Sequence, residues 1–335
     1  MQALKSVLTS IPPTIRTKVR TIFDFWLDEK DVIPEAEKDK IKGKKIKIIT
    51  HSGTFHPDDV FACATLMLLL KDNARIIRTR DKDIIKTGDY VVDVGNIYDP
   101  KKNRFDHHQE EGAGERKNGI PYASFGLVWK KFGKELCDSK EIAEKIDQKL
   151  VQQIDAVDNG IIICKPLKEN IYPYDIGELF DSFLPTWKEK ADFNKAFFEV
   201  FEIAKKILQR EILREKHKKV AEKFIVKAYK SAEDKRIIEI PGRIPWRETI
   251  TQYKEPLFVI TQGPDGKWLV LTIRDDPHSF ENRKDLPKSW GGLQDKELVK
   301  ITGVSDAIFC HKNIFIAVAK THEGALALAK LALRE

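Results

Sequence analysis

The sequence predicts an α/β protein with a parallel-sheet N-terminal domain, a long linker helix and a smaller α/β C-terminal domain. Three observations predict this class. Short β-branched runs alternate with segments of helical periodicity in residues 45–190, a charged helical pattern fills residues 191–232, and strand-like runs resume in residues 233–335. Such alternation is typical of sheets with helices packed on them. Residues 1–44 precede this pattern, and we expect a helical extension there.

The first part of the N-terminal extension admits two interpretations. Residues 1–23 carry basic and hydroxyl side chains but no acid. That composition is typical of a mitochondrial presequence, and it also suits an amphipathic helix that packs on the body of the protein. We favour the packed helix, which predicts a cytoplasmic protein, and keep a mitochondrial location as the alternative.

The elements of the N-terminal domain follow from its apolar runs. β-branched runs predict strands, and the apolar stretch after the first strand predicts a buried helix. A later run of apolar residues at helical spacing ends at Gly160, a typical helix stop. The predicted strands are 46–49, 74–80 and 90–99, and the predicted helices are about 57–71 and 140–160.

The rest of the chain predicts a connector and a second α/β unit. Residues 192–232 form one long helix or two, with a length and charge that suit a link between domains. The segment "PDG" (264–266) between two apolar runs predicts a hairpin turn, and residues 321–333 predict a closing amphipathic helix. The strand-like runs are 236–240, 256–262, 267–274, 307–311 and 314–318.

Composition excludes several classes of protein. Hydrophobic residues make up 41% and charged residues 33% of the chain, and no apolar run reaches the ~18–20 residues of a membrane span, so we expect no membrane contact. The four cysteines are scattered without a CxxC pair, which argues for a reducing compartment and against structural disulfides or a cysteine zinc site. The net charge of +7 weakly favours an anionic partner such as nucleic acid, although a generally lysine-rich composition explains it equally well.

Aspartates and histidines gather where the predicted strands end. "THSGTFHPDD" (50–59) follows the first strand, "VVDVG" (91–95) inserts Asp93 into an apolar run, and "RFDHHQ" (104–109) and "DAVDN" (155–159) add further carboxylates and imidazoles. Sites form at the carboxyl ends of strands in open α/β sheets. A buried carboxylate such as Asp93 is costly unless it is paired or binds a metal.

These residue types together predict a metal centre. Taken alone, His51 would be an ordinary loop histidine, and Asp155 and Asp158 would lie on a solvated helix face. The occurrence of all four segments in one chain favours a metal site. Mixed imidazole and carboxylate ligands suit manganese, zinc or iron better than calcium or magnesium. Two metals about 4 Å apart, bridged by a carboxylate, are the usual device for attack on a phosphodiester. We expect two divalent ions, with manganese favoured and zinc or magnesium as alternatives.

The same segments resemble the motifs of the Myg (melanocyte proliferating gene) exonuclease family, a branch of the DHH phosphoesterase superfamily. "IPWRE" (244–248), "DPHSFENRKDLPKSWGGL" (276–293) and "GVSDAIFCHKNIFIAVAKTHEGALALAK" (303–330) also resemble that family. The resemblance extends from about Lys45 to Leu333. It implies a DHH-type catalytic domain that binds the metals and a C-terminal domain that binds the substrate.

The resemblance also implies roles for single residues. His56 stands where the superfamily's first motif has an Asp, a replacement that the Myg family shares. Since alternate residues of an extended chain point to opposite sides, we expect His107 on the metal, with Asp106 and His108 on the other side. The implied metal ligands are His51, His56, Asp58, Asp93, His107 and Asp158. The residues that would orient those ligands are Asp59, Asp106 and Asp155. The residues implied in catalysis are Asp93, which would bridge the metals, Asp106, and His108, which would face the scissile phosphate.

The substrate contacts are less well defined by the resemblance. Relatives tend to carry a glycine-rich segment where this chain has Ala317–Ala319 ("AVA"), and the side chains remove the close backbone approach that glycine allows. Candidates for binding the substrate are His108, Arg283, His311, Lys320 and His322, with His278 and Trp290 as further candidates for charge and for base stacking.

Three functions compete. The resemblance implies a metal-dependent 3′-to-5′ exonuclease on RNA, with single-stranded DNA as a further substrate, acting by a two-metal mechanism. The alternative is a DHH-type hydrolase of a small phosphorylated compound, such as a dinucleotide or a nucleotide bisphosphate. A nucleic-acid-binding protein with a degenerate site is disfavoured, because every expected ligand position holds a competent ligand. The oligomeric state stays open, a homodimer included.

Overall fold

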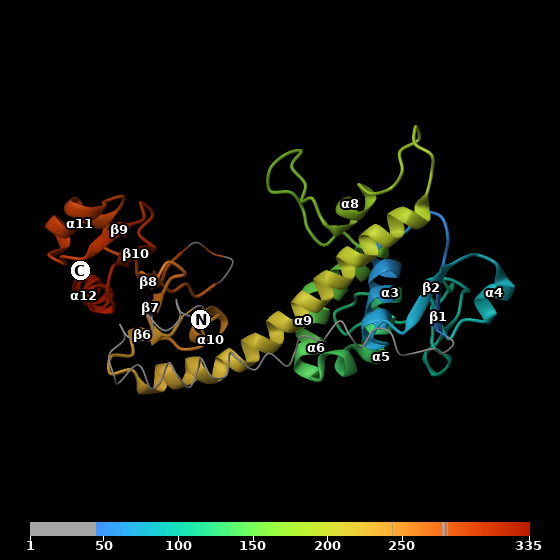
Figure 1. Cartoon of the computed structure of the whole chain (residues 1–335), viewed down its shortest axis with the longest axis horizontal. Coiled ribbons are helices and arrows are strands. Elements are labelled where there is room, and N and C mark those ends of the chain that lie inside the picture. The colour runs from blue at the N-terminus through green and yellow to red at the C-terminus, as the bar shows by residue number, and fades with distance from the viewer. Residues whose placement is uncertain (1–44, 243, 277–278, 280) are drawn as a thin grey trace, which may run out of the picture. The chain divides into compact units, whose positions relative to one another are not determined.

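The structure, a computed structural model, describes residues 45–242, 244–276, 279 and 281–335. The chain divides into two compact units, Lys42–His217 and Lys218–Glu335, which we call the N-terminal and C-terminal units (Figure 1). Each combines a sheet with helices, so the α/β class is confirmed. The extension predicted for residues 1–44, with its presequence alternative, and the candidate His278 lie outside the described residues. No helix in the described ranges is both long and apolar enough to cross a membrane.

The N-terminal sheet has five strands in the order β2-β1-β3-β5-β4. They are β1 (Ile46–Thr50), β2 (Ala74–Arg78), β3 (Tyr90–Val92), β4 (Tyr98–Asp99) and β5 (Arg104–Phe105). The β1–β2, β1–β3 and β3–β5 pairs are parallel, and β4 is antiparallel to β5. The single strand predicted for residues 90–99 is wrong. Asp93, Gly95 and Asn96 take positive φ values, so the chain turns between β3 and β4.

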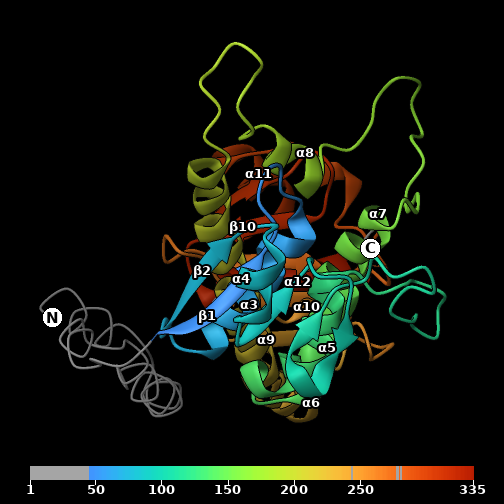
Figure 2. The same cartoon turned by 90° about the vertical axis from the view of Figure 1, so that its right-hand side faces the viewer.

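Helices cover this sheet and bury one another. α3 packs against α5 and against β1, and the helices and the strand lie close together in Figure 2. α3 is apolar on nearly every side, as its sequence predicts, and ten of its residues are buried. The helix predicted for residues 140–160 is α6 and α7 joined by a π-helical turn, η4. The helices are α3 (Pro57–Leu69), α4 (Lys82–Lys86), α5 (Ser124–Cys137), α6 (Lys140–Ile146), η4 (Asp147–Val151), α7 (Gln152–Asp158) and α8 (Ile176–Asp181), with the 3-10 turn η3 (Pro100–Lys102).

The predicted connector is one continuous helix, α9 (Phe193–Ser231). Its first half contributes Phe197 and Val200 to the core of the N-terminal unit. Its last turns contribute Ala221 and Ile225 to an apolar cluster of the C-terminal unit. Most helical stability comes from the packing of apolar side chains, so these contacts stabilise α9 at both of its ends.

The C-terminal sheet has five strands in the order β6-β7-β8-β10-β9. They are β6 (Ile237–Ile240), β7 (Phe258–Gln262), β8 (Trp268–Thr272), β9 (Ala307–Cys310) and β10 (Ile316–Ala319), accompanied by α10 (Arg247–Ile250), η5 (Lys288–Trp290), α11 (Asp295–Thr302) and α12 (His322–Arg334). The hairpin predicted at residues 264–266 is confirmed, because β7 and β8 pair antiparallel around it. Ala317 and Ala319 lie in β10 and are fully buried in the core of this unit.

Candidate metal centre

The carboxyl ends of three strands bring polar residues to one edge of the N-terminal sheet. β1, β3 and β5 run parallel, so all three end at the same edge. His51 follows β1, Asp93 follows β3, and Asp106–His108 follow β5. Asp58 in the first turn of α3 and Asp158 at the end of α7 reach the same edge.

Asp93 lies at the centre of this edge. Its Oδ2 is 3.1 Å from His51 Nε2, while its Oδ1 is 3.4 Å from His107 Nε2 and 3.5 Å from His108 Nδ1. Ser124 donates its hydroxyl to Oδ1 at 3.0 Å. Burial opposes ionisation of Asp93, but the hydrogen bonds with His107 and His51 outweigh it and lower the pKa of the carboxyl. The φ of +54° at Asp93 is a strained value for a non-glycine residue, and such strain clusters at functional sites.

Asp59 braces the loop that carries His51 and His56. Its Oδ1 accepts a hydrogen bond from the backbone N of His56 at 2.9 Å, which forms a capping box at the start of α3. Its Oδ2 is 3.5 Å from His51 Nε2. Burial raises the pKa of Asp59 to about 7, although the charge of His51 lowers it. On the other side of the His51 ring, Arg80 Nη2 is 3.2 Å from Nδ1, so the imidazole is held from both sides.

A second group of side chains lies between α3 and α7. His107 Nε2 is 3.1 Å from Asp158 Oδ2 and 3.8 Å from Asp58 Oδ2, and His56 Nδ1 is 4.0 Å from Asp158 Oδ1. Burial lowers the pKa of His107, but its close contacts with Asp158 and Asp93 outweigh burial and raise the pKa to about 10. This holds for the metal-free protein, because the imidazole must be neutral to bind an ion.

Asp58 is the clearest sign that a positive charge belongs here. It is fully buried, and neither of its carboxylate oxygens accepts a hydrogen bond from the residues that the structure describes. Burial, and then the charges of Asp93, Asp158 and Asp59, raise its pKa well above its ordinary value. A buried carboxylate without a donor is costly, and a bound cation reverses that cost.

His108 and Asp106 form a pair of their own. His108 Nδ1 is 2.7 Å from Asp106 Oδ1, and Asp106 Oδ2 accepts from the backbone N of Asn96. The hydrogen bond with Asp106 raises the pKa of His108 against the effect of burial. The side chain of His108 is 61% exposed, whereas that of His107 is only 9% exposed. Both rings nevertheless lie near Asp93, so the division of roles predicted for residues 106–108 stays a prediction.

Asp155 faces away from this edge. Its Oδ1 accepts from the backbone N of Gly126 at 3.0 Å, and its Oδ2 is 2.7 Å from Arg116 Nη1. Arg116 also pairs with Asp147 at 2.8 Å, which ties η4 to α7. A Cβ on Gly126 would lie 1.8 Å from the Asp155 carboxylate, so glycine is required there. Asp155 therefore anchors the helix that ends at Asp158.

Sequence reasoning missed the partners that come from distant segments. Ser124 contacts Asp93, Arg80 contacts the His51 ring, and Arg116 binds Asp155. None of them stands in a motif of carboxylates and imidazoles. The only signal was an unexplained Arg or Ser near the start of an element, which is too common to single out.

The donor set fits divalent metal ions. Two groups have ligand atoms that all lie within 4.8 Å of one another: Asp93, His107 and His108 in one, and His56, Asp58 and Asp158 in the other. Imidazole nitrogens with carboxylate oxygens suit manganese, zinc or iron. The unsatisfied oxygens of Asp58 supply the structural reason for an ion, and Asp93 lies against both His51 and His107 as a shared ligand would.

The predicted substrate residues of the C-terminal unit have varied surroundings. The guanidinium of Arg283 donates to the carbonyls of Thr251, Tyr253 and Pro256 and to Asp275. His322 Nε2 is 2.9 Å from Glu239 Oε2. His311 accepts a hydrogen bond from the backbone N of Asn313, and Lys320 lines an open hollow with Lys296 and Lys300. Trp290 is 1% exposed, so its ring is a core contact and offers no face to a base. The substrate roles of the other four stay predictions.

The fold and the site define an α/β protein with candidate metal-binding clusters at the carboxyl edge of its parallel sheet. Comparison with known proteins gives its family. The chain belongs to the MYG1 exonuclease family, because the family model, described as an uncharacterised protein family (UPF0160), matches residues 47–333. The resemblance seen in the sequence is thereby confirmed at the level of this family.

Relatives match over nearly the whole chain. A protein of Rattus norvegicus named "MYG1 exonuclease" is 31% identical, and the alignment covers 99% of this chain and 95% of the relative. The Homo sapiens "MYG1 exonuclease" is 30% identical, covering 99% of this chain and 96% of the relative. A "MYG1 protein" of Dictyostelium discoideum is 32% identical over 85% of this chain and 95% of the relative.

Proposed function

We propose that this protein is a metal-dependent nuclease that hydrolyses RNA from the 3′ end with two divalent ions, manganese favoured, on a domain of the DHH type. The relatives named exonuclease support the reaction class. The observation that carries the two-ion proposal is the position of Asp93, whose two oxygens lie against different imidazoles, His51 on one side and His107 on the other. A carboxylate placed between two imidazoles has the position that a ligand bridging two ions would take.

The residues divide the work of the reaction as follows. His51, His56, Asp58, Asp93, His107 and Asp158 would hold the ions. When bound, the ions supply a nucleophile near neutral pH and neutralise the charge of the scissile phosphate. Asp59 and Asp155 keep α3 and α7 in place.

His108 and Asp106 handle the substrate in this proposal. Asp106 accepts the Nδ1 proton of His108, which turns Nε2 toward solvent. A protonated His108, favoured by its raised pKa, then donates to a phosphate oxygen of the strand. Ser124 fixes the Asp93 carboxylate from the opposite side, so the bridging group stays in one orientation.

The test compares three substrates in parallel. The protein is incubated with manganese and, separately, with a 5′-labelled RNA, a single-stranded DNA of the same sequence and a dinucleotide. Stepwise shortening of the RNA supports the proposal, while cleavage of the dinucleotide alone supports the small-molecule hydrolase. An Asp93→Asn preparation is the control for contaminating nuclease. Turnover that is equal in this control would refute the assignment of the site.

Cellular location belongs to the same proposal. A nuclease that reaches RNA in a reducing compartment fits a cytoplasmic protein, with mitochondria as the alternative that the basic N-terminal segment keeps open. Fluorescent tagging of the full chain, compared with a chain that starts at Lys45, tests this. Loss of a mitochondrial signal on truncation would establish the alternative.

A further inference from the structure

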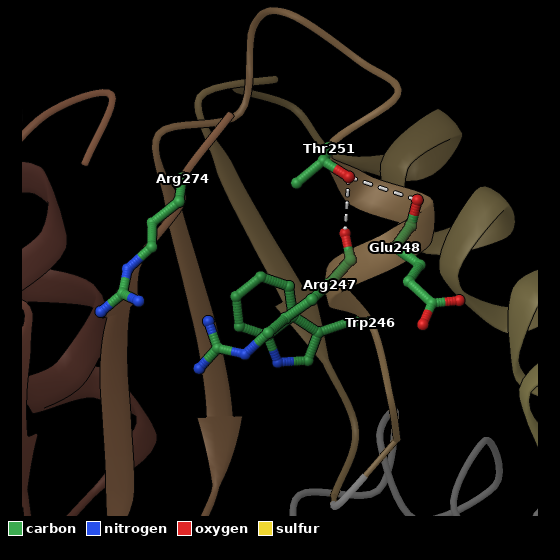
Figure 3. A pocket seen from close by; sticks show the side chains of 5 residues that line it. All are labelled: Trp246, Arg247, Glu248, Thr251 and Arg274. Atoms are coloured by element: carbon green, nitrogen blue, oxygen red, sulfur yellow. Dashed lines mark hydrogen bonds between the residues drawn. The ribbon is translucent and has the colours of Figure 1, made fainter. Parts of the chain in front are cut away.

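A hollow in the C-terminal unit is lined by two arginines and a tryptophan. Its lining residues are Trp246, Arg247, Glu248, Thr251 and Arg274, and its volume is about 250 Å³. Figure 3 shows the guanidinium groups of Arg247 and Arg274 on the same side of this hollow, with Arg247 beside the Trp246 ring. Arg247 belongs to the segment "IPWRE" (244–248), but neither arginine was a candidate site residue, and neither belongs to the metal centre.

Arg247 is held in place but its charge is not neutralised. Its guanidinium carbon lies over the Trp246 ring, 4.7 Å from the ring centroid. Within the described ranges its side-chain nitrogens make no hydrogen bond and no ion pair. The stacked contact orders the side chain, so little conformational freedom remains to be lost when an anion binds.

Two arginines and one carboxylate line the hollow. Burial, and then the charge of Arg274, lower the pKa of Arg247, as expected where two guanidinium groups face the same hollow. The carboxylate in the lining, Glu248, accepts from Lys218 at 2.6 Å and is thereby engaged. An anion placed between the two guanidinium groups would relieve their repulsion.

The walls of the hollow are fixed by a deeply placed arginine. Arg283, whose side chain is 7% exposed, donates to Thr251 O at 3.0 Å and to Asp275 Oδ1 at 2.7 Å. Thr251 lines the hollow directly, and Asp275 follows Arg274 in the chain. Arg283 therefore fastens the segment after α10 to the segment after β8, and the two arginines of the lining stand on fixed backbone.

Size and chemistry select the ligand. The volume is below the ~300–1,000 Å³ typical of pockets that enclose a drug-sized ligand, so it suits a phosphate group better than a whole nucleotide. The guanidinium fork matches phosphate oxygens in a bidentate way, which the ammonium group of lysine does not. The second hollow, around Lys296, Lys300 and Lys320, also contains the carboxylate of Asp295, and it is the weaker candidate for that reason.

We propose that Arg247 and Arg274 bind a backbone phosphate of single-stranded nucleic acid, with Trp246 as the support on which Arg247 rests. The identity of the strand rests on the proposed nuclease function. The net charge of +7 is consistent with such a partner. Exposed bases stack on guanidinium planes as well as on aromatic rings, so the outer face of Arg247 is also open to a base next to the bound phosphate.

The test measures binding without turnover. The full chain carrying Asp93→Asn is loaded with manganese, and a labelled single-stranded RNA is titrated at several salt concentrations. Adding Arg247→Gln or Arg274→Gln should weaken binding about tenfold, the typical effect of a charge-assisted hydrogen bond. Each loss should make the dependence of log Kd on log salt shallower by about 0.7, the value per phosphate contact on a single strand.

The matched control is Arg334→Gln, which removes the same charge from the exposed end of α12. It should leave the affinity within about twofold and the salt slope unchanged. Equal RNA affinities and salt slopes for Arg247→Gln and Arg334→Gln would overturn the proposal. The proposal would also fail if inorganic phosphate bound in the hollow but the affinity for RNA did not change in Arg247→Gln. If the unmodified protein cleaves no RNA but binding still depends on Arg247, the proposed function fails and this inference stands.

Discussion

The two units differ in which ionisable side chains they bury and in how those side chains are paired. Among the described residues, the fully buried carboxylates and the buried imidazole lie in the N-terminal unit. Asp58, Asp59 and His51 lie at the carboxyl edge of its sheet, whereas Asp155 pairs with Arg116 away from that edge. The buried polar residues of the C-terminal unit are threonines, and its deeply placed guanidinium, Arg283, is satisfied by carbonyls and a carboxylate. Folding alone favours the second arrangement, because a buried charge without a partner is costly.

The difference indicates where each unit meets its ligand. At the acidic edge of the N-terminal unit, the oxygens of Asp58 accept no hydrogen bond from the described residues, and our proposal places a cation there. In the C-terminal unit the described buried polar residues are uncharged, and the exposed Arg247 lines a hollow open to solvent. Metal removal should therefore change the stability of the N-terminal unit. Added salt should instead weaken the binding of RNA by the C-terminal unit.

The largest expected effect comes from Asp93→Asn. The substitution keeps the size of the side chain but removes the charge that faces His51, His107 and His108. Turnover of RNA should fall by at least about a hundredfold, the scale on which loss of one preorganised electrostatic contact acts. Asp83→Asn, an exposed residue on α4, is the matched control and should keep full activity. Retention of more than a few per cent of the activity by Asp93→Asn would contradict a bridging role.

The second effect separates the chemical step from metal binding. His108→Ala should lower kcat by about 10²–10⁴-fold if the imidazole donates a proton to the substrate, with metal content unchanged. Asp106→Asn should give a smaller loss, because the ring of His108 keeps its place but loses the charge that favours its protonated form. Metal content is measured on the purified variants. A matched loss of bound metal in His108→Ala would make His108 a ligand, a role that its 3.5 Å distance from Asp93 also permits.

The contrast between local and distant partners also explains what the sequence could predict. Asp93 was identifiable because valines flank it, and the adjacent imidazoles of His107 and His108 were identifiable as a motif. The alternation of an extended chain predicted opposite sides for these two rings, but both lie near Asp93. The pairing of Asp155 with Arg116 could not be predicted from the sequence. The two residues are far apart in the chain and meet only when α7 packs beside the loop before α5. The turn after β3 did carry a local signal, because Asp93, Gly95 and Asn96 are residue types that adopt positive φ readily, and the surrounding apolar residues outweighed that signal in the prediction.

The third prediction concerns stability and has an unusual sign. Because burial and neighbouring acids raise the pKa of Asp58, its ionised form destabilises the metal-free protein, and this cost grows as pH rises above the unfolded value near 4. Asp58→Asn should then stabilise the metal-free protein at pH 8 by about 1–3 kcal/mol and flatten its pH dependence. With manganese present, the same variant should lose part of the stabilisation that the ion provides. Urea unfolding with and without chelator measures both; a destabilised metal-free variant would mean that Asp58 already has a favourable partner.

The smallest effect tests the C-terminal unit by the same logic. The hydrogen bond with Glu239 raises the pKa of His322 against the effect of burial. A raised histidine pKa contributes stability that is fully present below the unfolded value of about 6.5 and is lost as pH rises through the folded pKa. Since Glu239 is largely exposed, the contribution should be about 0.2–1 kcal/mol. His322→Gln can still form a hydrogen bond but cannot titrate. The difference in urea midpoint between this variant and the unmodified protein should therefore shrink from pH 5 to pH 8. The difference should be the same with and without manganese. A difference that depends on manganese would contradict the independence of this unit from the metal centre, because it would couple a C-terminal ion pair to the acidic edge of the other sheet.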